Sequence, residues 1–360
     1  MRHAITILFC AALLQCSREP VELSPWARAQ RGTVHVQADL TSLLDNAVIP
    51  PGNAAPLQHS VVRIEGVARA GIYMQAPTRA RFPVFVHPGA RLAAWVGMIP
   101  GSWSGSTDGV EFRVSILGVG SQDSVFLDSV RLDPRTRGQD RRWFALEHAL
   151  LPWAGSSVLI ELAIEPGPAG DTYQDWGIWG EPVVYAPSLP PPETTPEEIE
   201  QLIEEGTMQL DWCFTSTRAI GLPGQGQSPV YLTSAFSLDG VLREGLYAHP
   251  PWSISQTITP GPRPRFVTSL GMVPSCWEQS DGVLFSLRAE TAGTAATTLF
   301  EYWLSPRANR CDRGWVDIAV DLSQFAGKPL TLTLVTSAGP LDDLTCDSVT
   351  LGSPQVISRP

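Results

Sequence analysis

The sequence is poor in positive charge and in long apolar runs. It has 25 basic against 36 acidic residues, a net charge of −11, and Lys328 is its single lysine. A surface of this sign does not attract nucleic acid or anionic lipid. No stretch of about 20 apolar residues occurs, so no membrane-spanning helix is predicted.

Catalytic motifs are missing as well. The six His share no motif, and no two are spaced as a zinc pair. GSWSG at 101–105 has Trp103 where a nucleophile elbow needs Ser, and no glycine-rich phosphate loop occurs. We therefore predict that the protein is not an enzyme. The remaining enzymatic alternative is a glycoside hydrolase, which needs two carboxylates, such as Asp171 with Asp175 or Glu147.

The N-terminus has the pattern of an export signal. Arg2 precedes an apolar run at 4–14, which is too short to span a bilayer and ends at Gln15 and Cys16. The run LLQC resembles a bacterial lipobox, in which the Cys takes the lipid, although Gln15 replaces the usual small residue. This predicts a signal peptide at 1–15 and a lipid anchor on Cys16, in the cell envelope on the outer membrane or facing the periplasm. The alternative is ordinary cleavage without a lipid.

The rest of the chain contains an internal duplication. Three pairs of segments carry it: RAGIYMQAP at 69–77 with REGLYAHPP at 243–251, GMIPGSWSGSTDGVEF at 97–112 with GMVPSCWEQSDGVLF at 271–285, and LDPRTRGQDRRW at 132–143 with LSPRANRCDRGW at 304–315. The offset stays near 174 and then 172 residues, as the quoted segment numbers show. We call residues 26–187 copy one and residues 208–357 copy two.

A spacer separates the copies at 188–207. It begins with the run LPPP, which favours an extended chain. Thr195 before Pro196 then predicts the start of a short helix, with acidic residues in its first turn and Gly206 at its end. We predict a Pro-rich linker with one short helix.

Each copy has the pattern of a β-sandwich. Val110, Phe112 and Val114 alternate with polar residues, which is typical of strands with one buried face. Further short segments of this kind recur between Gly, Pro and Asp clusters, with no helical pattern between them. The predicted fold class is all-β, with two tandem jelly-roll domains.

The ordered motifs also resemble a known family. TDGVEF, the LDPR and DRRW run, the turn LPWAG (LSQFAG in copy two) and especially GDTYQDWGIWGEP at 170–182 are similar to bacterial galactose-binding-like β-sandwiches, which include carbohydrate-binding modules. The resemblance implies a jelly-roll fold and a glycan ligand, which aromatic rings and polar side chains would bind. The candidate ligand-binding residues are Trp103, Asp108, Asp171, Tyr173, Asp175, Trp176 and Trp179. The alternative is that these aromatic residues pack in the core and the acids close turns.

Copy two departs from this pattern. Its counterpart of the 170–180 segment reads DDLTCDSVTLG, so Ser348 and Leu351 replace Trp176 and Trp179. A glycan partner is therefore predicted for copy one. A structural or protein-interaction role in the envelope, without a sugar ligand, is the second hypothesis.

Four cysteines lie in copy two behind an export signal, which predicts two disulfides. Of the three connectivities that four cysteines allow, we expect Cys276 with Cys311 and Cys213 with Cys346. No cofactor or catalytic metal is predicted.

A structural calcium ion is a separate hypothesis for the jelly roll. Loop acids and carbonyl oxygens are the ligands that calcium prefers. Asp133, Asp171 and Asp175 are the acids that could contribute.

Overall fold

The computed structural model describes residues 34–53, 55–187, 206–211 and 231–359. Within these residues the regular structure is β-strands and short 3₁₀ turns, and no helix is long and apolar enough to cross a membrane. The predicted signal peptide, Cys16, the linker helix and Cys213 lie outside the described residues, so these expectations stay predictions.

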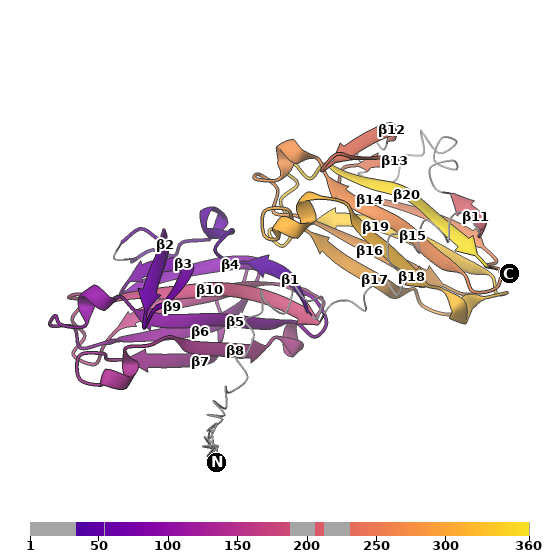
Figure 1. The fold of residues 1–360 in the computed structure, drawn as a ribbon. Coiled ribbons are helices and arrows are strands. Elements are labelled where there is room, and N and C mark those ends of the chain that lie inside the picture. Colours follow the sequence, from indigo (N-terminus) through magenta and orange to yellow (C-terminus); the bar gives the residue numbers. More distant parts are fainter. Residues whose placement is uncertain (1–33, 54, 188–205, 212–230, 360) are drawn as a thin grey trace, which may run out of the picture.

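Copy one is a sandwich of two antiparallel sheets (Figure 1). One sheet has the order β2-β3-β10-β5-β8, with β1 also paired to β10, and the other has the order β4-β9-β6-β7. The strands are β1 (Val34–Asp39), β2 (Gln58–Ile64), β3 (Val67–Gln75), β4 (Thr78–Val86), β5 (Arg91–Met98), β6 (Val110–Gly118), β7 (Ser124–Leu132), β8 (Phe144–Ala149), β9 (Ser156–Pro166) and β10 (Trp176–Pro187). The 3₁₀ turns are η1 (Leu44–Asn46), η2 (Pro100–Ser102), η3 (Gly138–Asp140) and η4 (Leu151–Trp153).

Copy two repeats this topology strand for strand. Its sheets are β12-β13-β20-β15-β18, with β11 paired to β20, and β14-β19-β16-β17. The strands are β11 (Thr207–Asp211), β12 (Tyr231–Leu238), β13 (Val241–Ala248), β14 (Trp252–Ile258), β15 (Arg265–Met272), β16 (Val283–Glu290), β17 (Thr297–Leu304), β18 (Val316–Asp321), β19 (Leu330–Ala338) and β20 (Val349–Ser358). The 3₁₀ turns are η5 (Pro274–Cys276), η6 (Arg310–Arg313) and η7 (Ser323–Phe325). The all-β class and the two sandwiches predicted from the sequence are confirmed.

The core of each sandwich follows from the period-two pattern. Val110, Phe112 and Val114 on β6 are buried between the sheets, and Leu332 and Leu334 on β19 do the same in copy two. Successive side chains of a strand point to opposite faces, so alternation places one row in the core. Removing this row from water is the main favourable contribution to folding.

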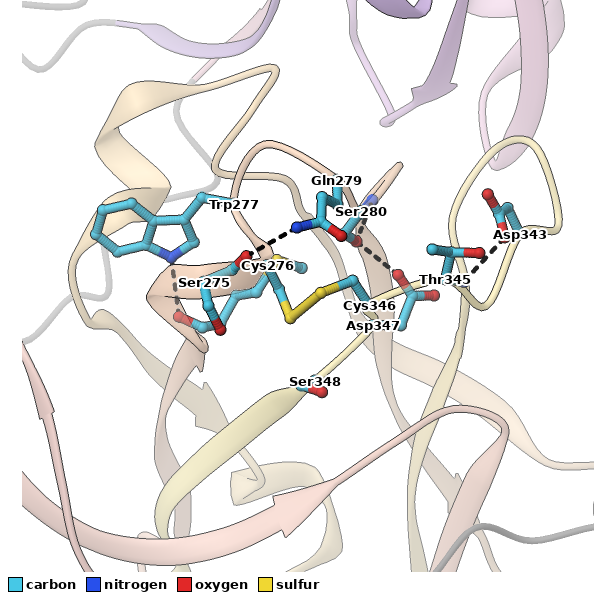
Figure 2. Close-up of a disulfide and its surroundings, with 12 residues drawn as sticks. Ser275, Cys276, Trp277, Gln279, Ser280, Asp343, Thr345, Cys346, Asp347 and Ser348 are labelled. Atoms are coloured by element: carbon cyan, nitrogen blue, oxygen red, sulfur yellow. Dashed lines mark hydrogen bonds between the residues drawn. A yellow bond between two sulfur atoms is a disulfide. The ribbon is translucent and has the colours of Figure 1, made fainter.

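The disulfide prediction is wrong in its pairing. Cys276 bonds to Cys346 with the Cα atoms 5.2 Å apart (Figure 2). Cys311 is exposed and free. The reason is strand order, because β15 and β20 are neighbours and Met272 pairs with Val349. The loop after β15, which carries Cys276, therefore lies beside the loop before β20, which carries Cys346. Cys311 lies in η6, between β17 and β18.

This disulfide should contribute much of the stability of copy two. It closes a loop with a sequence separation of 70, and cross-linking a loop of that size lowers the entropy of the unfolded chain by the equivalent of about 4 kcal/mol. We expect C276S/C346S to lower the free energy of unfolding of copy two by about that amount in urea titrations. The control C311S should leave it within about 0.5 kcal/mol. An unchanged unfolding midpoint in the double variant would contradict the assignment.

Candidate functional site

A cavity lies at one end of copy one, where β3 ends and β10 begins. Its volume is about 650 Å³. Its lining residues are Gln75, Gly170, Asp171, Thr172, Tyr173, Gln174 and Trp176. Gln75 and Trp176 are register partners in the sheet, so one side of the cavity stands on paired strands. Tyr173 is 62% exposed and Trp176 is half-buried, so both rings are within reach of a ligand.

Local hydrogen bonds shape the loop at 170–174, which lines this cavity. The backbone N–H of Tyr173 donates to Asp171 Oδ1 at 3.1 Å, which closes an Asx turn. Gln174 then takes a positive φ of 58°, and the backbone N–H of Ala76 donates to the Asp175 carbonyl at 3.0 Å. These contacts turn the chain sharply and place Trp176 at the start of β10.

Three carboxylates gather beneath the loop. Asp108, Asp171 and Asp175 each offer an oxygen, and these atoms lie within 4.8 Å of one another. Asp108 accepts from the backbone N–H of Ala169, and Asp175 Oδ1 accepts from the Thr107 hydroxyl at 2.6 Å. Asp175 is fully buried. Burial, reinforced by repulsion from Asp108 and Asp171, raises the pKa of Asp175 to about 6.

Copy two holds the same acidic arrangement. Asp347 accepts from the Ser280 hydroxyl at 2.5 Å and Asp343 from the Thr345 backbone N–H at 2.9 Å (Figure 2). Asp281 accepts from the Leu341 backbone N–H at 2.7 Å. Burial raises the pKa of Asp281 to about 6 and that of Asp347 to about 7. The acids therefore belong to the framework that both copies share.

The aromatic residues at the cavity distinguish the copies. Thr345 and Ser348 in copy two stand where copy one has Tyr173 and Trp176. The disulfide holds the copy-two loop at Cys346, the counterpart of Gln174, and both residues have a positive φ. Copy one thus has an aromatic cavity under a loop without a cross-link, whereas copy two has a cross-linked loop without those rings.

Two of the predicted ligand-binding tryptophans do not line the cavity. Trp179 is fully buried and packs edge-on against Phe112 with ring centroids 5.4 Å apart, so it is a core residue. Trp103 is half-buried, its indole N–H donates to the Met98 carbonyl at 3.1 Å, and Arg141 lies 5.8 Å above its ring. For both tryptophans the structure agrees with the packing alternative.

The remaining predicted residues divide between the cavity and its support. Asp171, Tyr173 and Trp176 line the cavity, and Asp108 and Asp175 lie in the carboxylate cluster. The predicted set lacks four lining residues, Gln75, Gly170, Thr172 and Gln174. Gln75 lies in the repeated segment at 69–77, immediately before a cis Ala76–Pro77 bond whose counterpart in copy two is also a cis bond.

The carboxylates proposed for a glycoside hydrolase are engaged in hydrogen bonds within the sandwich. Asp175 is fully buried and engaged by Thr107, so it faces no open cleft. Glu147 lies on β8 and accepts hydrogen bonds from Arg91 Nε at 2.7 Å and from the Tyr185 hydroxyl. A glycosidase needs both carboxyl groups at one substrate, and this arrangement does not favour one.

The donor set does fit a hard cation such as calcium. Asp108 Oδ1 and Asp175 Oδ2 are buried oxygens without a hydrogen-bond partner, and calcium prefers carboxylate oxygens. Asp133, which we expected among the ligands, instead accepts hydrogen bonds from the backbone N–H and hydroxyl of Thr136. Asp108 takes its place in the cluster, and calcium binding stays a prediction.

Part of the chain is similar in sequence to an uncharacterized protein. No family model matches the chain. It is 34% identical over 100 residues to an uncharacterized protein of Archaeoglobus fulgidus, and the match covers 28% of this chain and only 25% of that protein.

Similar solved structures are carbohydrate-binding modules. The CBM22 tandem domain of Paenibacillus barcinonensis Xyn10C is 12% identical with a TM-score of 0.27, over 90% of this chain and 97% of that one. The CBM51 of Clostridium perfringens GH95, solved with methyl-galactose, is 14% identical with a TM-score of 0.27, over 38% of this chain and 92% of that one.

The buried Asp175 predicts a specific pH dependence. Its pKa of about 6 in the folded chain exceeds its ordinary value of 3.8. Protonation therefore favours the folded state, and that contribution is fully present below about pH 4 and is lost as the pH rises to about 6. D175N keeps an oxygen acceptor for Thr107 but does not ionise. In EDTA at pH 7.5 we expect D175N to raise the Tm of copy one by at least about 2 °C.

With calcium in place of EDTA, we expect the wild-type chain to have a higher Tm than D175N. If the carboxylates bind the ion, calcium raises the Tm of the wild-type chain and not that of D175N. D133N is the matched control and should respond to calcium as the wild type does. A lower Tm for D175N in EDTA would show that the ionised carboxylate stabilises the loop.

Proposed function

We propose that the protein is an exported, non-catalytic glycan-binding protein whose ligand site is the cavity of copy one. The observation that carries this proposal is the combination of exposed Tyr173 and half-buried Trp176 with the amides of Gln75 and Gln174 in a cavity of about 650 Å³. Aromatic faces stack on the apolar side of a pyranose ring, and amides and carboxylates hydrogen-bond its hydroxyls.

The charge of the cavity indicates the kind of sugar. Its described lining contains the carboxylate of Asp171 and no Arg, Lys or His. Without a bound cation, a uronic acid or another anionic sugar would meet a like charge and no cationic side chain of the lining. We therefore infer that the ligand is a neutral glycan.

The cellular setting rests on the N-terminal sequence. The signal-like segment 1–15 and the lipobox-like LLQC support export and a lipid on Cys16. An anchor there would present both sandwiches at a membrane surface in the cell envelope. Metabolic labelling with a fatty-acid analogue, which C16S should abolish, tests this part separately.

Several observations favour a second candidate, a structural or interaction role without a sugar. Trp103 and Trp179 are packing residues, and the acidic framework recurs in copy two without the cavity aromatics. On this hypothesis the cavity would be a by-product of the duplicated framework.

Substitutions that copy the second sandwich test the glycan site. We expect W176S and Y173T, which install the residues found at 348 and 345, to weaken binding of a neutral polysaccharide at least tenfold, about 1.4 kcal/mol. Titration calorimetry against a panel of neutral and acidic polysaccharides gives the measurement. F126A removes another exposed aromatic ring, on β7 outside the cavity, and should bind as the wild type does. Equal binding by all variants, or no binding by the folded protein, would leave the structural role.

An engineered cross-link offers a reversible test of the same loop. Ser102 and Gln174 are the counterparts of Cys276 and Cys346. We expect S102C/Q174C to form a disulfide that removes the Gln174 amide and ties the loop down, which lowers affinity at least tenfold. Reduction should free the loop and recover binding to the level of the single variant Q174C. The wild type under the same reductant is the control for loss of the native disulfide.

A further inference from the structure

The two sandwiches meet at a defined joint. The backbone N–H of Asp39, at the end of β1, donates to the Ala308 carbonyl of copy two at 2.7 Å. Trp303 at 3% exposure and Ala308 at 0% pack with the core residues of copy one, and Leu284 also contacts that cluster. In Figure 1 the end of copy one near β1 faces copy two.

The apolar side of this joint is specific to copy two. Leu284 and Trp303 are register partners on β16 and β17. Their counterparts in copy one are Glu111 and Arg131, which are likewise register partners on β6 and β7. The duplicated framework therefore offers the same pair of positions twice, and only copy two fills them with large apolar side chains.

His87 lies at the centre of the contact. It follows β4 and is 3% exposed. Its Nε2 accepts a hydrogen bond from the backbone N–H of Trp303 at 3.3 Å. Because β17 is the edge strand of its sheet, this N–H has no neighbouring strand to pair with, and the imidazole supplies the acceptor. The other nitrogen, Nδ1, is buried without a partner.

Aromatic rings and a second histidine surround His87. The rings of Phe85 and Tyr302 lie 5.3 Å and 6.0 Å from it, centroid to centroid. His35 Nε2 is 3.2 Å from the Tyr302 hydroxyl, which donates to Asp312 Oδ1 at 2.8 Å. Among the described residues no carboxylate forms an ion pair with His87. A proton on Nε2 would remove the acceptor for Trp303 and leave a buried cation without a counterion.

We propose that this joint is sensitive to pH and that protonation of His87 releases copy two from copy one. Burial, with repulsion from His35, holds the pKa of His87 at about 3, below its ordinary value of 6.5. Burial also lowers the pKa of His35. Docking therefore favours the neutral imidazoles of His87 and His35, and the docking equilibrium constant is highest above about pH 6.5. Below that, the docking equilibrium constant falls about tenfold per pH unit for His87 alone.

Asp312 acts in the opposite sense. Burial raises its pKa to about 7, so any part of that shift due to docking favours the docked state as the pH falls. Its hydrogen-bond donors are Ser305, Tyr302 and Asn309, all within copy two. Burial also raises the pKa of Asp39, whose carboxylate accepts hydrogen bonds from Thr41 and Ser42 within copy one. Because the partners of both acids stay with them when the sandwiches separate, we infer that the histidines dominate the pH response.

The joint and the glycan cavity lie at opposite ends of copy one. β4 begins at Thr78, next to the cavity residue Gln75, and ends at Val86, next to His87. Opening the joint would alter the spacing of the two sandwiches and leave the cavity intact. The proposal is therefore independent of the glycan-binding function.

Small-angle X-ray scattering on residues 17–360 tests the proposal. We expect the radius of gyration to rise between pH 7.5 and pH 4.5, with unchanged far-ultraviolet circular dichroism because both sandwiches stay folded. H87Q keeps an acceptor for Trp303 without a titrating group, and should stay compact throughout this range. H59Q alters an exposed histidine and should open as the wild type does.

A permanent charge separates the proposal from acid unfolding. H87K should be extended at pH 7.5, as should W303R, which installs the residue found at 131. A compact H87K, or a wild type whose scattering is the same at both pH values, would overturn the proposal. So would a transition that persists in H87Q and disappears in D312N, because that result would assign the response to Asp312.

Discussion

The pairing of one central strand with two neighbours governs most of this molecule. In each copy the last strand, β10 or β20, lies between the third and the fifth strands of its sandwich. The register of this last strand places the loop that precedes it beside the loops that follow the third and fifth strands. In copy one this brings Trp176 beside Gln75, and in copy two it brings Cys346 beside Cys276. The candidate site and the disulfide are thus two outcomes of the same backbone constraint.

The strands and turns of the framework can be predicted from the sequence because the patterns that indicate them lie within short segments or occur in both copies. Period-two alternation around Phe112 identifies a strand from a few residues, and the duplication shows that each turn motif occurs in the same order twice. The cluster around Asp171, Tyr173 and Trp176 is also contiguous. Contiguous residues in one loop share a site whichever way the strands pair.

What the sequence did not predict depends on strand order. Cys276 directly precedes Trp277, and Cys311 lies shortly before Trp315. Both tryptophans have counterparts in copy one, which is why we expected these two cysteines to pair, yet the adjacency of β15 and β20 selects the true partner, Cys346. Gln75 reaches the cavity across 100 residues through the same kind of pairing. Trp179 follows Trp176 by three positions, which in a strand turns its side chain to the opposite face and into the core. Alternation alone shows that the two differ, but not which of them is buried.

The charged pair Glu111 and Arg131 has a consequence for assembly. A head-to-tail contact between two copies of one domain uses different surfaces on each, and such contacts continue into open filaments when every copy carries both surfaces. Copy two carries the apolar surface formed by Leu284 and Trp303, whereas copy one has acid and base at those positions. A further molecule therefore finds no apolar surface on copy one with which to extend the row. The head-to-tail contact between the two domains therefore occurs once within the chain and is not repeated between molecules.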